Sequence, residues 1–284
     1  MKTLGKLQSN EDVVNKQPKT LLIGWGWVGQ FCNKYFTKAD IYRSNGFQKK
    51  EFNHYDLAII SVPTPMNPQT GQCDTSIVEE MVKTFKDGVD YFLIKSTVEI
   101  GTTDRLREKY KVKIGFSPEF VGETLGNIMI EPHKDAFQII GGLDDTTEAI
   151  AGFWRLVLNA NAPIMLVTAR EAEIIKYCEN YWIMQRVDYW NDVYEICKTL
   201  GGKFDRVREG LVLDPRFSRT HSFVYPNNRG WSGKCLPKDM NALSYTMTKA
   251  GNSLLTLMQQ IYKNVNQWRS SYKNKEQLIP NDKL

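Results

Sequence analysis

One cysteine near the carboxyl end of the chain has neighbours that suit a nucleophile. Cys235 lies in the segment Gly-Trp-Ser-Gly-Lys-Cys-Leu-Pro-Lys-Asp, residues 230–239. Glycines let a substrate approach closely, and Lys234 and Lys238 could favour the thiolate, which is the reactive form of cysteine. Most lone cysteines are small buried hydrophobic residues, and that interpretation suits the cysteines in helix-like stretches, Cys32, Cys178 and Cys197. It suits Cys235 poorly, because glycines, lysines and an aspartate are unusual neighbours in a core.

Two further pairs of polar residues have positions that could serve a reaction. Lys176 and Asn180 lie four apart in a helical pattern and so project from one helix face, where a solvated polar stripe is the simpler explanation. Glu119 and Glu123 follow a strand-like run, and α/β sheets bind ligands at strand ends, although loop carboxylates are also common there. Spacing alone therefore leaves both pairs open.

A glycine-rich turn lies near the start of the chain. Residues 24–29 read Gly-Trp-Gly-Trp-Val-Gly and separate an apolar strand pattern from a helix pattern. In a dinucleotide site such glycines allow a tight turn, close approach to the pyrophosphate and helix–strand packing. A turn that merely joins strand and helix is the alternative. In this context the motif predicts cofactor contacts from Gly24, Gly26, Trp27, Val28 and Gly29.

The acidic residue expected about 20 positions after such a turn is missing. The second strand-like run reads Asp-Ile-Tyr-Arg, residues 40–43, and Arg43 stands where a carboxylate usually binds the ribose. An arginine there can accommodate a 2′-phosphate, or it can be a solvated side chain that stacks on adenine. NAD is the expected cofactor, and NADP stays open.

Helices and strands must position these residues. The first part of the chain alternates strand and helix patterns. The strand-like runs are Thr20–Ile23, Asp40–Arg43, Asp56–Val62, Tyr91–Lys95, Val112–Phe116, Phe137–Ile140 and Ile164–Val167. The helical patterns are Val28–Tyr35, Thr75–Phe85, Thr102–Lys109 and Thr146–Leu158. Such alternation predicts an α/β fold with a Rossmann-like, doubly wound parallel sheet.

The pattern changes at Ala169. From there to about Leu200 the chain has apolar residues at helical spacing and no Gly or Pro, until Gly201-Gly202 ends the run. A helix of this length, about 45 Å, can connect the sheet to a smaller all-α central domain. A loop-rich stretch, Asp214–Asp239, then precedes helix-like segments. We therefore predict an N-terminal tail (1–17), a dinucleotide-binding domain (18–168), a helical central and dimerisation domain with the cysteine (169–270), and a C-terminal tail (271–284).

Composition narrows the classes of function. The net charge of +5 is modest, and no dense Lys/Arg block indicates nucleic-acid binding. The longest apolar runs, such as Leu57–Val62, are strand-sized, which predicts no membrane span. Five scattered cysteines without a CxxC pair, and no signal peptide, predict free thiols in a cytoplasmic protein without a metal site.

Several motifs occur together in a specific order. After the glycine turn come Ser-Val-Pro-Thr-Pro (61–65), Lys-Ser-Thr-Val-Glu-Ile-Gly-Thr-Thr (95–103) and Ser-Pro-Glu-Phe (117–120). Ala-Glu-Ile-Ile-Lys-Tyr-Cys-Glu-Asn (172–180) and the Cys235 segment follow. In this order the chain resembles the UDP-glucose/GDP-mannose dehydrogenase family along nearly its whole length, and Ser-Pro-Glu-Phe favours UDP-glucose as the sugar nucleotide.

The resemblance implies that a sugar C6 alcohol is oxidised to a carboxylate with two cofactor molecules in turn. Cys235 would form a thiohemiacetal and then a thioester, while Lys176 and Asn180 would stabilise the oxyanion. The residues that would position or activate water are Asp239, Thr97 and Glu123. Further implied cofactor contacts are Val62, Pro63, Thr64, Thr97 and Glu123. Implied substrate contacts are Glu119, Phe120, Val121, Lys176, Asn180, Arg216, Arg219, Tyr225 and Gly233, with Glu119 orienting the substrate loop. A homodimer through the long helix is also implied, with Arg216 or Arg219 reaching the neighbouring subunit.

The chain departs from the family pattern in three ways. Gly122 stands where the family has a basic residue, and Gly-Trp-Ser-Gly (230–233) stands where it has Gly-aromatic-Gly-Gly. We also expect no second α/β domain after the helical one, although that domain grips the nucleotide in family enzymes. Two alternatives therefore stay open: a catalytically weak dinucleotide or sugar-nucleotide binding protein, and a dehydrogenase of a smaller hydroxy acid or free sugar.

Overall fold

The computed structural model describes residues 17–120, 137–226, 229–231 and 235–252. These residues divide into two compact units. The first takes most of the chain up to Lys176, and the second takes the short segment Met66–Cys73 and the chain from Tyr177 onward.

The first unit contains an eight-stranded sheet with the order β3-β2-β1-β4-β5-β6-β7-β8. The strands are β1 (Thr20–Ile23), β2 (Asp40–Arg43), β3 (Gly46–Lys49), β4 (Tyr55–Ile60), β5 (Val89–Ile94), β6 (Lys113–Phe116), β7 (Gln138–Gly141) and β8 (Ile164–Val167). The strand order reverses between β1 and β4: successive strands extend the sheet to one side from β1 to β3 and to the other side from β4 to β8. Open α/β sheets bind ligands at such a switch point.

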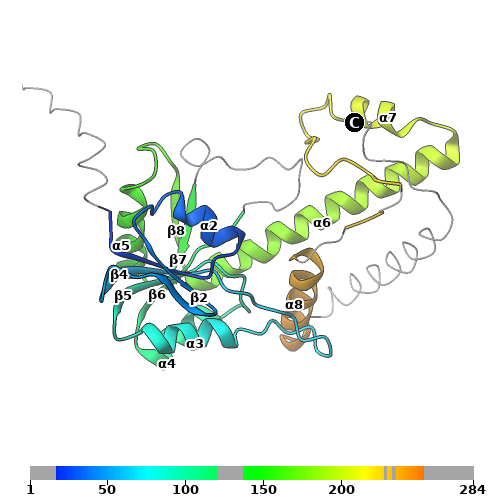
Figure 1. Cartoon of the computed structure of the whole chain (residues 1–284). Helices are drawn as coiled ribbons and strands as arrows, with labels where there is room; N and C mark the ends of the chain where they lie inside the picture. Colours follow the sequence, from blue (N-terminus) through cyan, green and yellow to red (C-terminus); the bar gives the residue numbers. More distant parts are fainter. Residues whose placement is uncertain (1–16, 121–136, 227–228, 232–234, 253–284) are drawn as a thin grey trace, which may run out of the picture. The chain divides into compact units, whose positions relative to one another are not determined.

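Helices cover both faces of this sheet (Figure 1). The helices are α2 (Trp27–Asn33), α3 (Ser76–Phe85), α4 (Thr102–Tyr110) and α5 (Asp144–Arg155). One apolar layer includes Val78 and Val82 of α3 and Leu106 of α4. The other includes Phe31 of α2 and Trp154 of α5, which is fully buried. Burial on both faces explains why β1 and β4 are nearly all apolar.

The sheet is mostly parallel, as expected, but two strand pairs are antiparallel. Strand β3 has no counterpart among the predicted strands, and it pairs antiparallel with β2 through a tight turn. Asn45-Gly46 is a strong hairpin signal, and Gly46 has a φ of +95° that suits glycine. The second antiparallel pair is β6–β7. The remaining neighbours, β1–β2, β1–β4, β4–β5, β5–β6 and β7–β8, are parallel.

Three helices follow the sheet: α6 (Ala169–Leu200), α7 (Phe204–Leu211) and α8 (Cys235–Lys249). Helix α6 has 32 residues and runs from the first unit into the second. In the second unit Met184 of α6 packs with Met240 of α8 and with Trp231. Trp190 of α6 packs with Phe204 and Leu211 of α7. The α/β class, the long helix and the smaller helical part are thus confirmed.

One local expectation in this region is wrong. The stretch from Cys235 to Asp239 was expected in a loop, but it is the first described turn of α8. Pro237 does not prevent this, because the first turn of a helix tolerates proline. The domain bounds stay predictions, and residues 1–16 and 271–284 of the two predicted tails lie outside the described residues. None of the described helices is long and apolar enough to cross a membrane.

Candidate active site

The glycine turn joins β1 to α2 with a different constraint at each glycine. Gly24 has a φ of +100°, and a Cβ there would lie 2.3 Å from the Ser61 carbonyl oxygen. A Cβ at Gly29 would lie 2.2 Å from the Gly24 oxygen, so this glycine permits close packing. A Cβ at Gly26 would meet nothing within 4 Å. The backbone at Gly26 is therefore open to a ligand, as close approach of a pyrophosphate requires.

The residues after β4 and β5 meet this turn. Ser61 N–H donates to the Ile23 carbonyl at 2.8 Å, which places the Ser-Val-Pro-Thr-Pro segment beside the end of β1. Ser96 Oγ donates to the Val62 carbonyl at 2.7 Å. Thr64 Oγ1 donates to the Thr97 carbonyl at 2.7 Å. The structure thus brings together the predicted cofactor residues of three neighbouring strands, and their arrangement fits a dinucleotide.

A second group forms around Glu119, just after β6. Lys176 Nζ donates to the Glu119 backbone carbonyl at 2.6 Å and lies 5.5 Å from the centre of the Phe120 ring. The Glu119 carboxylate turns inward, where its Oε2 is 3.5 Å from Lys95 Nζ. Three residues predicted to contact substrate therefore lie together, although 57 positions separate Lys176 from Glu119.

Lys95 is a residue of this group that the sequence argument did not single out. Its side chain is buried, and Nζ donates to Gln138 Oε1 at 3.1 Å. Ser117 Oγ donates to the same oxygen at 3.2 Å. A lysine that directly follows an apolar strand is the only sequence signal for this role. Lys95 holds the Glu119 carboxylate away from solvent.

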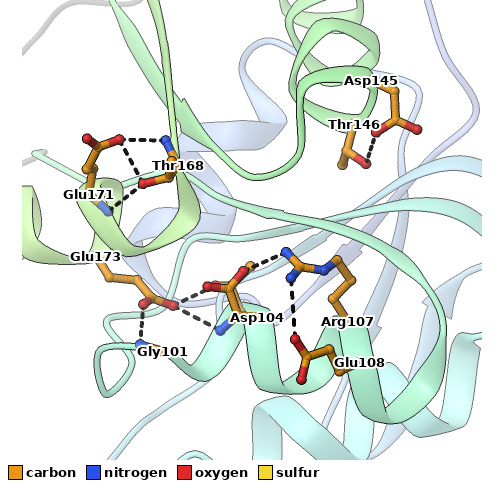
Figure 2. Close-up of polar contacts among 10 residues, drawn as sticks. Gly101, Asp104, Arg107, Glu108, Asp145, Thr146, Thr168, Glu171 and Glu173 are labelled. Atoms are coloured by element: carbon orange, nitrogen blue, oxygen red, sulfur yellow. Dashed lines mark hydrogen bonds and ion pairs between the residues drawn. The ribbon is translucent and has the colours of Figure 1, made fainter.

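Two carboxylates from the first turns of α6 cap helix starts (Figure 2). Glu171 Oε2 accepts hydrogen bonds from the Thr168 N–H at 2.8 Å and from Thr168 Oγ1 at 2.7 Å, which is a capping box. Glu173 is buried and caps α4 instead. It accepts bonds from the Gly101 N–H at 2.5 Å, the Thr103 N–H at 2.9 Å and Thr103 Oγ1 at 2.7 Å. Burial raises the pKa of the Glu173 carboxyl above its ordinary value, although these donors act in the opposite direction.

The second unit pairs Asn180 of α6 with Asp239 of α8. Asn180 Nδ2 donates to Asp239 Oδ2 at 2.5 Å, and Lys238 Nζ lies 2.5 Å from Asp239 Oδ1. Asn180 and Asp239 are both buried, so a solvated polar stripe does not describe this part of α6. Cys235 lies one helical turn before Asp239 and is exposed. The predicted nucleophile and two of its predicted helpers thus occur in one helical unit.

The backbone that leads to Cys235 is attached to α6. Arg229 is buried, and its Nε donates to Asn191 Oδ1 at 2.6 Å while its Nη1 lies 2.6 Å from Glu195 Oε1. The Gly230 N–H also donates to Asn191 Oδ1, at 3.0 Å. Residue spacing did not predict this network. Its only signal is polar Asn191 and Glu195, spaced four apart among the aromatic residues of α6.

The remaining predicted residues are exposed residues in ion pairs, other exposed residues, and residues outside the described part of the chain. Arg216 and Arg219 are exposed and pair with Asp214 and Glu209 at 2.5 Å and 2.6 Å. Tyr225 and Arg43 are exposed. Val121, Glu123 and Gly233 lie outside the described residues. The described part of the chain has no group of three or more His, Cys, Asp or Glu side chains that could bind a metal ion.

The expectations for the other cysteines are right for two and wrong for one. Cys32 and Cys197 are buried, and burial raises the pKa of the Cys32 thiol to about 12. Cys178 is exposed, because it lies on the same outward face of α6 as Ile174 and Trp182, which are also exposed. Helical spacing alone does not tell the inner face from the outer one.

Two models of one protein family match successive parts of this chain. Residues 34–153 match the model described as UDP-glucose/GDP-mannose dehydrogenase family, NAD binding domain, and residues 170–268 match that of the family's central domain. The UDP-glucose 6-dehydrogenase of Streptococcus pneumoniae is 30% identical over 74% of this chain and 54% of its own length. The UDP-glucose 6-dehydrogenase of Campylobacter jejuni is 28% identical over 80% of this chain and 58% of its own length.

A solved UDP-glucose dehydrogenase from Pyrobaculum islandicum has the same fold. Its TM-score is 0.76 at 22% identity, over 93% of this chain and 70% of that one. The chain spans about half the length of the curated relatives it matches. The match to the NAD binding domain supports NAD as the cofactor. Because the two family models match successive parts that together cover most of the sequence, the chain belongs to the UDP-glucose/GDP-mannose dehydrogenase family.

Proposed function

We propose that this chain carries the chemistry of a nucleotide-sugar 6-dehydrogenase that converts UDP-glucose to UDP-glucuronate with NAD. The observation that carries the proposal is an exposed Cys235 one helical turn from the buried Asn180–Asp239 pair. This arrangement occurs in a chain whose other unit has the glycine geometry of a dinucleotide site. The names of the relatives support UDP-glucose as substrate.

Cys235 is the proposed nucleophile of the second half of the reaction. The first oxidation converts the C6 alcohol to an aldehyde, and the Cys235 thiolate then adds to the aldehyde carbon to form a thiohemiacetal. The second oxidation leaves a thioester. Water attacks its carbonyl carbon, the carbon–sulfur bond breaks, and the carboxylate leaves with the thiolate restored. NAD, when bound, would supply the hydride acceptor for both oxidations.

Hydrogen-bond donors and carboxylates have separate proposed roles. The Lys176 ammonium and the Asn180 amide stabilise the oxyanion that forms when Cys235 or water adds to the carbonyl carbon. Asp239 receives donors from both Asn180 and Lys238, which favours a carboxylate with a defined orientation. It positions and activates the attacking water together with Thr97 and Glu123. Glu119 has a different proposed role. Because its carboxylate faces Lys95, it orients the substrate loop.

The proposed partner of each chain is a second copy bound through α6. Trp182, Tyr189 and Ile196 are exposed by 59%, 42% and 56% and repeat every seven residues. Seven-residue spacing keeps apolar side chains on one helix face and suits helix pairing. On this proposal Arg216 or Arg219, both exposed, contributes to the substrate site of the neighbouring copy.

The direct test mixes the protein with UDP-glucose and NAD and follows the absorbance of the reduced cofactor and the amount of UDP-glucuronate. We expect two reduced cofactors per acid formed. Cys235→Ser should form no acid, and Asp239→Asn should lower turnover by about 10²–10⁴-fold. The control is Cys178→Ser, which removes the other exposed cysteine and should keep wild-type turnover.

Three results would count against this proposal. Binding of NAD without turnover of UDP-glucose or GDP-mannose would support a binding protein instead. Faster turnover of free hydroxy acids than of sugar nucleotides would support a dehydrogenase of smaller substrates. Full acid production by Cys235→Ser would remove the cysteine from the mechanism.

A further inference from the structure

The end of β2 lacks the carboxylate that usually selects NAD. Between Gly24 and Glu51 the sequence has one acidic residue, Asp40. A carboxylate at the end of the second strand normally binds the 2′-hydroxyl of the adenosine ribose and repels a 2′-phosphate. Asp40 would have to supply it, and the structure gives Asp40 another role.

Asp40 is fully buried at the start of β2, where its carboxylate already has several donors. Its oxygens accept hydrogen bonds from the Glu51 N–H at 2.8 Å, the Phe52 N–H at 2.9 Å and the Tyr55 hydroxyl at 2.9 Å. A ligand would have to break these bonds inside the protein to reach the carboxylate. Asp40 therefore secures the chain that connects β3 to β4.

Arg43 lies at the other end of β2, beside the glycine turn. The Gly24 N–H donates to the Tyr42 carbonyl at 2.9 Å, so the last two residues of β2 border that turn. Arg43 lies three positions after Asp40 along the strand, which corresponds to about 10 Å. Arg43 is exposed and forms no ion pair with any residue the structure describes. Its guanidinium is thus available to a ligand at this end of the sheet.

We propose that Arg43 is a specificity-determining residue that binds the 2′-phosphate of NADP, so that the chain binds NADP as well as NAD. The inference rests on the proposed dinucleotide site of the first unit. A guanidinium binds a phosphate through charge-assisted, bidentate hydrogen bonds. The β2–β3 hairpin supports the position, because Arg43 pairs with Gly46 and the Gln48 side chain donates to Asn45 Oδ1 at 3.0 Å.

Two small ligands isolate this contact from the rest of the cofactor. Adenosine 5′-monophosphate and adenosine 2′,5′-bisphosphate differ only by the 2′-phosphate. Isothermal titration calorimetry with each one measures binding without any catalytic step. We expect the bisphosphate to bind the wild-type chain at least as tightly as the monophosphate. The same titrations with NAD and NADP should give dissociation constants within about tenfold of each other.

Variants at Arg43 should change the affinity for ligands with a 2′-phosphate and leave the affinity for ligands without it nearly unchanged. Because Arg43→Ala removes a charge-assisted hydrogen bond, it should weaken the binding of NADP and of the bisphosphate about 10- to 100-fold and change the binding of NAD little. Arg43→Asp should weaken NADP further and leave NAD bound. The charge-matched control is Lys50→Ala. Lys50 is exposed and follows Lys49, which pairs with Ile41 near the start of β2, so it lies away from Arg43.

The outcomes separate this inference from the proposed function. If neither NAD nor NADP binds the wild-type chain, the proposed function itself is wrong. If NAD binds more than about 100-fold more tightly than NADP while Arg43 is present, the specificity inference is wrong and the proposed function stands. An equal loss of NAD and NADP in Arg43→Ala would show that Arg43 stacks on adenine, which also overturns the inference.

Discussion

A single buried carboxylate connects the start of α6 to the start of α4. Glu173 has two acceptor oxygens that face two backbone N–H groups and one hydroxyl, and Lys176 follows it by three residues on the same helix. The Lys176 ammonium donates to the Glu119 carbonyl. By fixing this part of α6, Glu173 therefore also helps to position Lys176. Its neighbour Glu171 makes a comparable cap at the surface (Figure 2).

Replacing Glu173 by glutamine should therefore destabilise the protein. The amide keeps one acceptor oxygen but turns its NH₂ group toward a buried donor, which leaves that donor unsatisfied. We expect a loss of about 1–3 kcal/mol in the free energy of unfolding, measured by urea denaturation at neutral pH. The matched control is Glu171→Gln, where solvent can replace the lost bond and the loss should stay below about 1 kcal/mol. A larger loss in Glu171→Gln than in Glu173→Gln would contradict this reading of the cap.

At the scale of elements, one carboxylate links α3 to α4. Glu79 of α3 lies 2.6 Å from Arg105 Nη1 and 2.5 Å from Lys109 Nζ, and the Tyr110 hydroxyl donates to it at 2.9 Å. Both helices cover the same face of the sheet (Figure 1). Hydrogen bonds from Lys109 and Arg105 lower the pKa of the Glu79 carboxyl from its ordinary value of 4.5 to about 2.

This lowered pKa predicts a pH-dependent contribution to stability. Between pH 4.5 and about 2 the folded chain binds fewer protons at Glu79 than the unfolded chain, so stability falls as the pH is lowered through that range. Glu79→Gln should cost about 1 kcal/mol at pH 7, because these partners are partly solvated, and the gap to wild type should close toward pH 2. Urea denaturation of both proteins from pH 2 to pH 7 measures this difference in the free energy of unfolding.

The control for this prediction lies next in the chain. Glu80→Gln alters an exposed carboxylate on the same helix that pairs with none of the described residues, so its stability should follow that of wild type at each pH. A Glu79→Gln variant that matches wild type at pH 7 would show that the ion pairs contribute nothing measurable.

At the scale of the whole molecule, α6 has an exposed apolar face. A helix of 32 residues is about 48 Å long, and Trp182, Tyr189 and Ile196 repeat along one side of it. In a two-fold dimer the same face of each copy meets the other. The exposed apolar face of α6 is therefore the proposed centre of the interface.

A charge in this face should separate the copies. Trp182→Glu and Ile196→Glu each place a carboxylate where the proposed interface is apolar, and loss of an anchor costs about 2 kcal/mol or more. We expect the dimer to dissociate at a protein concentration at least about 30-fold higher than for wild type. Light scattering after size-exclusion chromatography measures the mass. Leu213→Glu is the control, because Leu213 is 85% exposed and does not belong to α6. A wild-type chain that is monomeric at high concentration would refute the proposal.

Features that depend on local spacing could be predicted from the sequence. Glycine spacing identified the turn, where Gly24 needs a positive φ and Gly29 tight packing. Alternating patterns located seven of the eight described strands, and the run from Ala169 to about Leu200 predicted α6, which spans Ala169–Leu200. The hairpin strand β3 was missed, because its four residues include a glycine, a glutamine and a lysine. Its pairing partner, not its hydrophobicity, makes it a strand.

Which polar groups meet could be learned only from the folded chain. Sequence could propose Cys235 as the nucleophile and Lys176, Asn180 and Asp239 as its helpers, but not that Asn180 donates to Asp239. It placed Arg43 at the end of β2 and could not show that Asp40 is already bonded elsewhere. The physical reason is that hydrogen bonds between distant segments depend on how helices and strands pack, and local spacing carries no information about that packing.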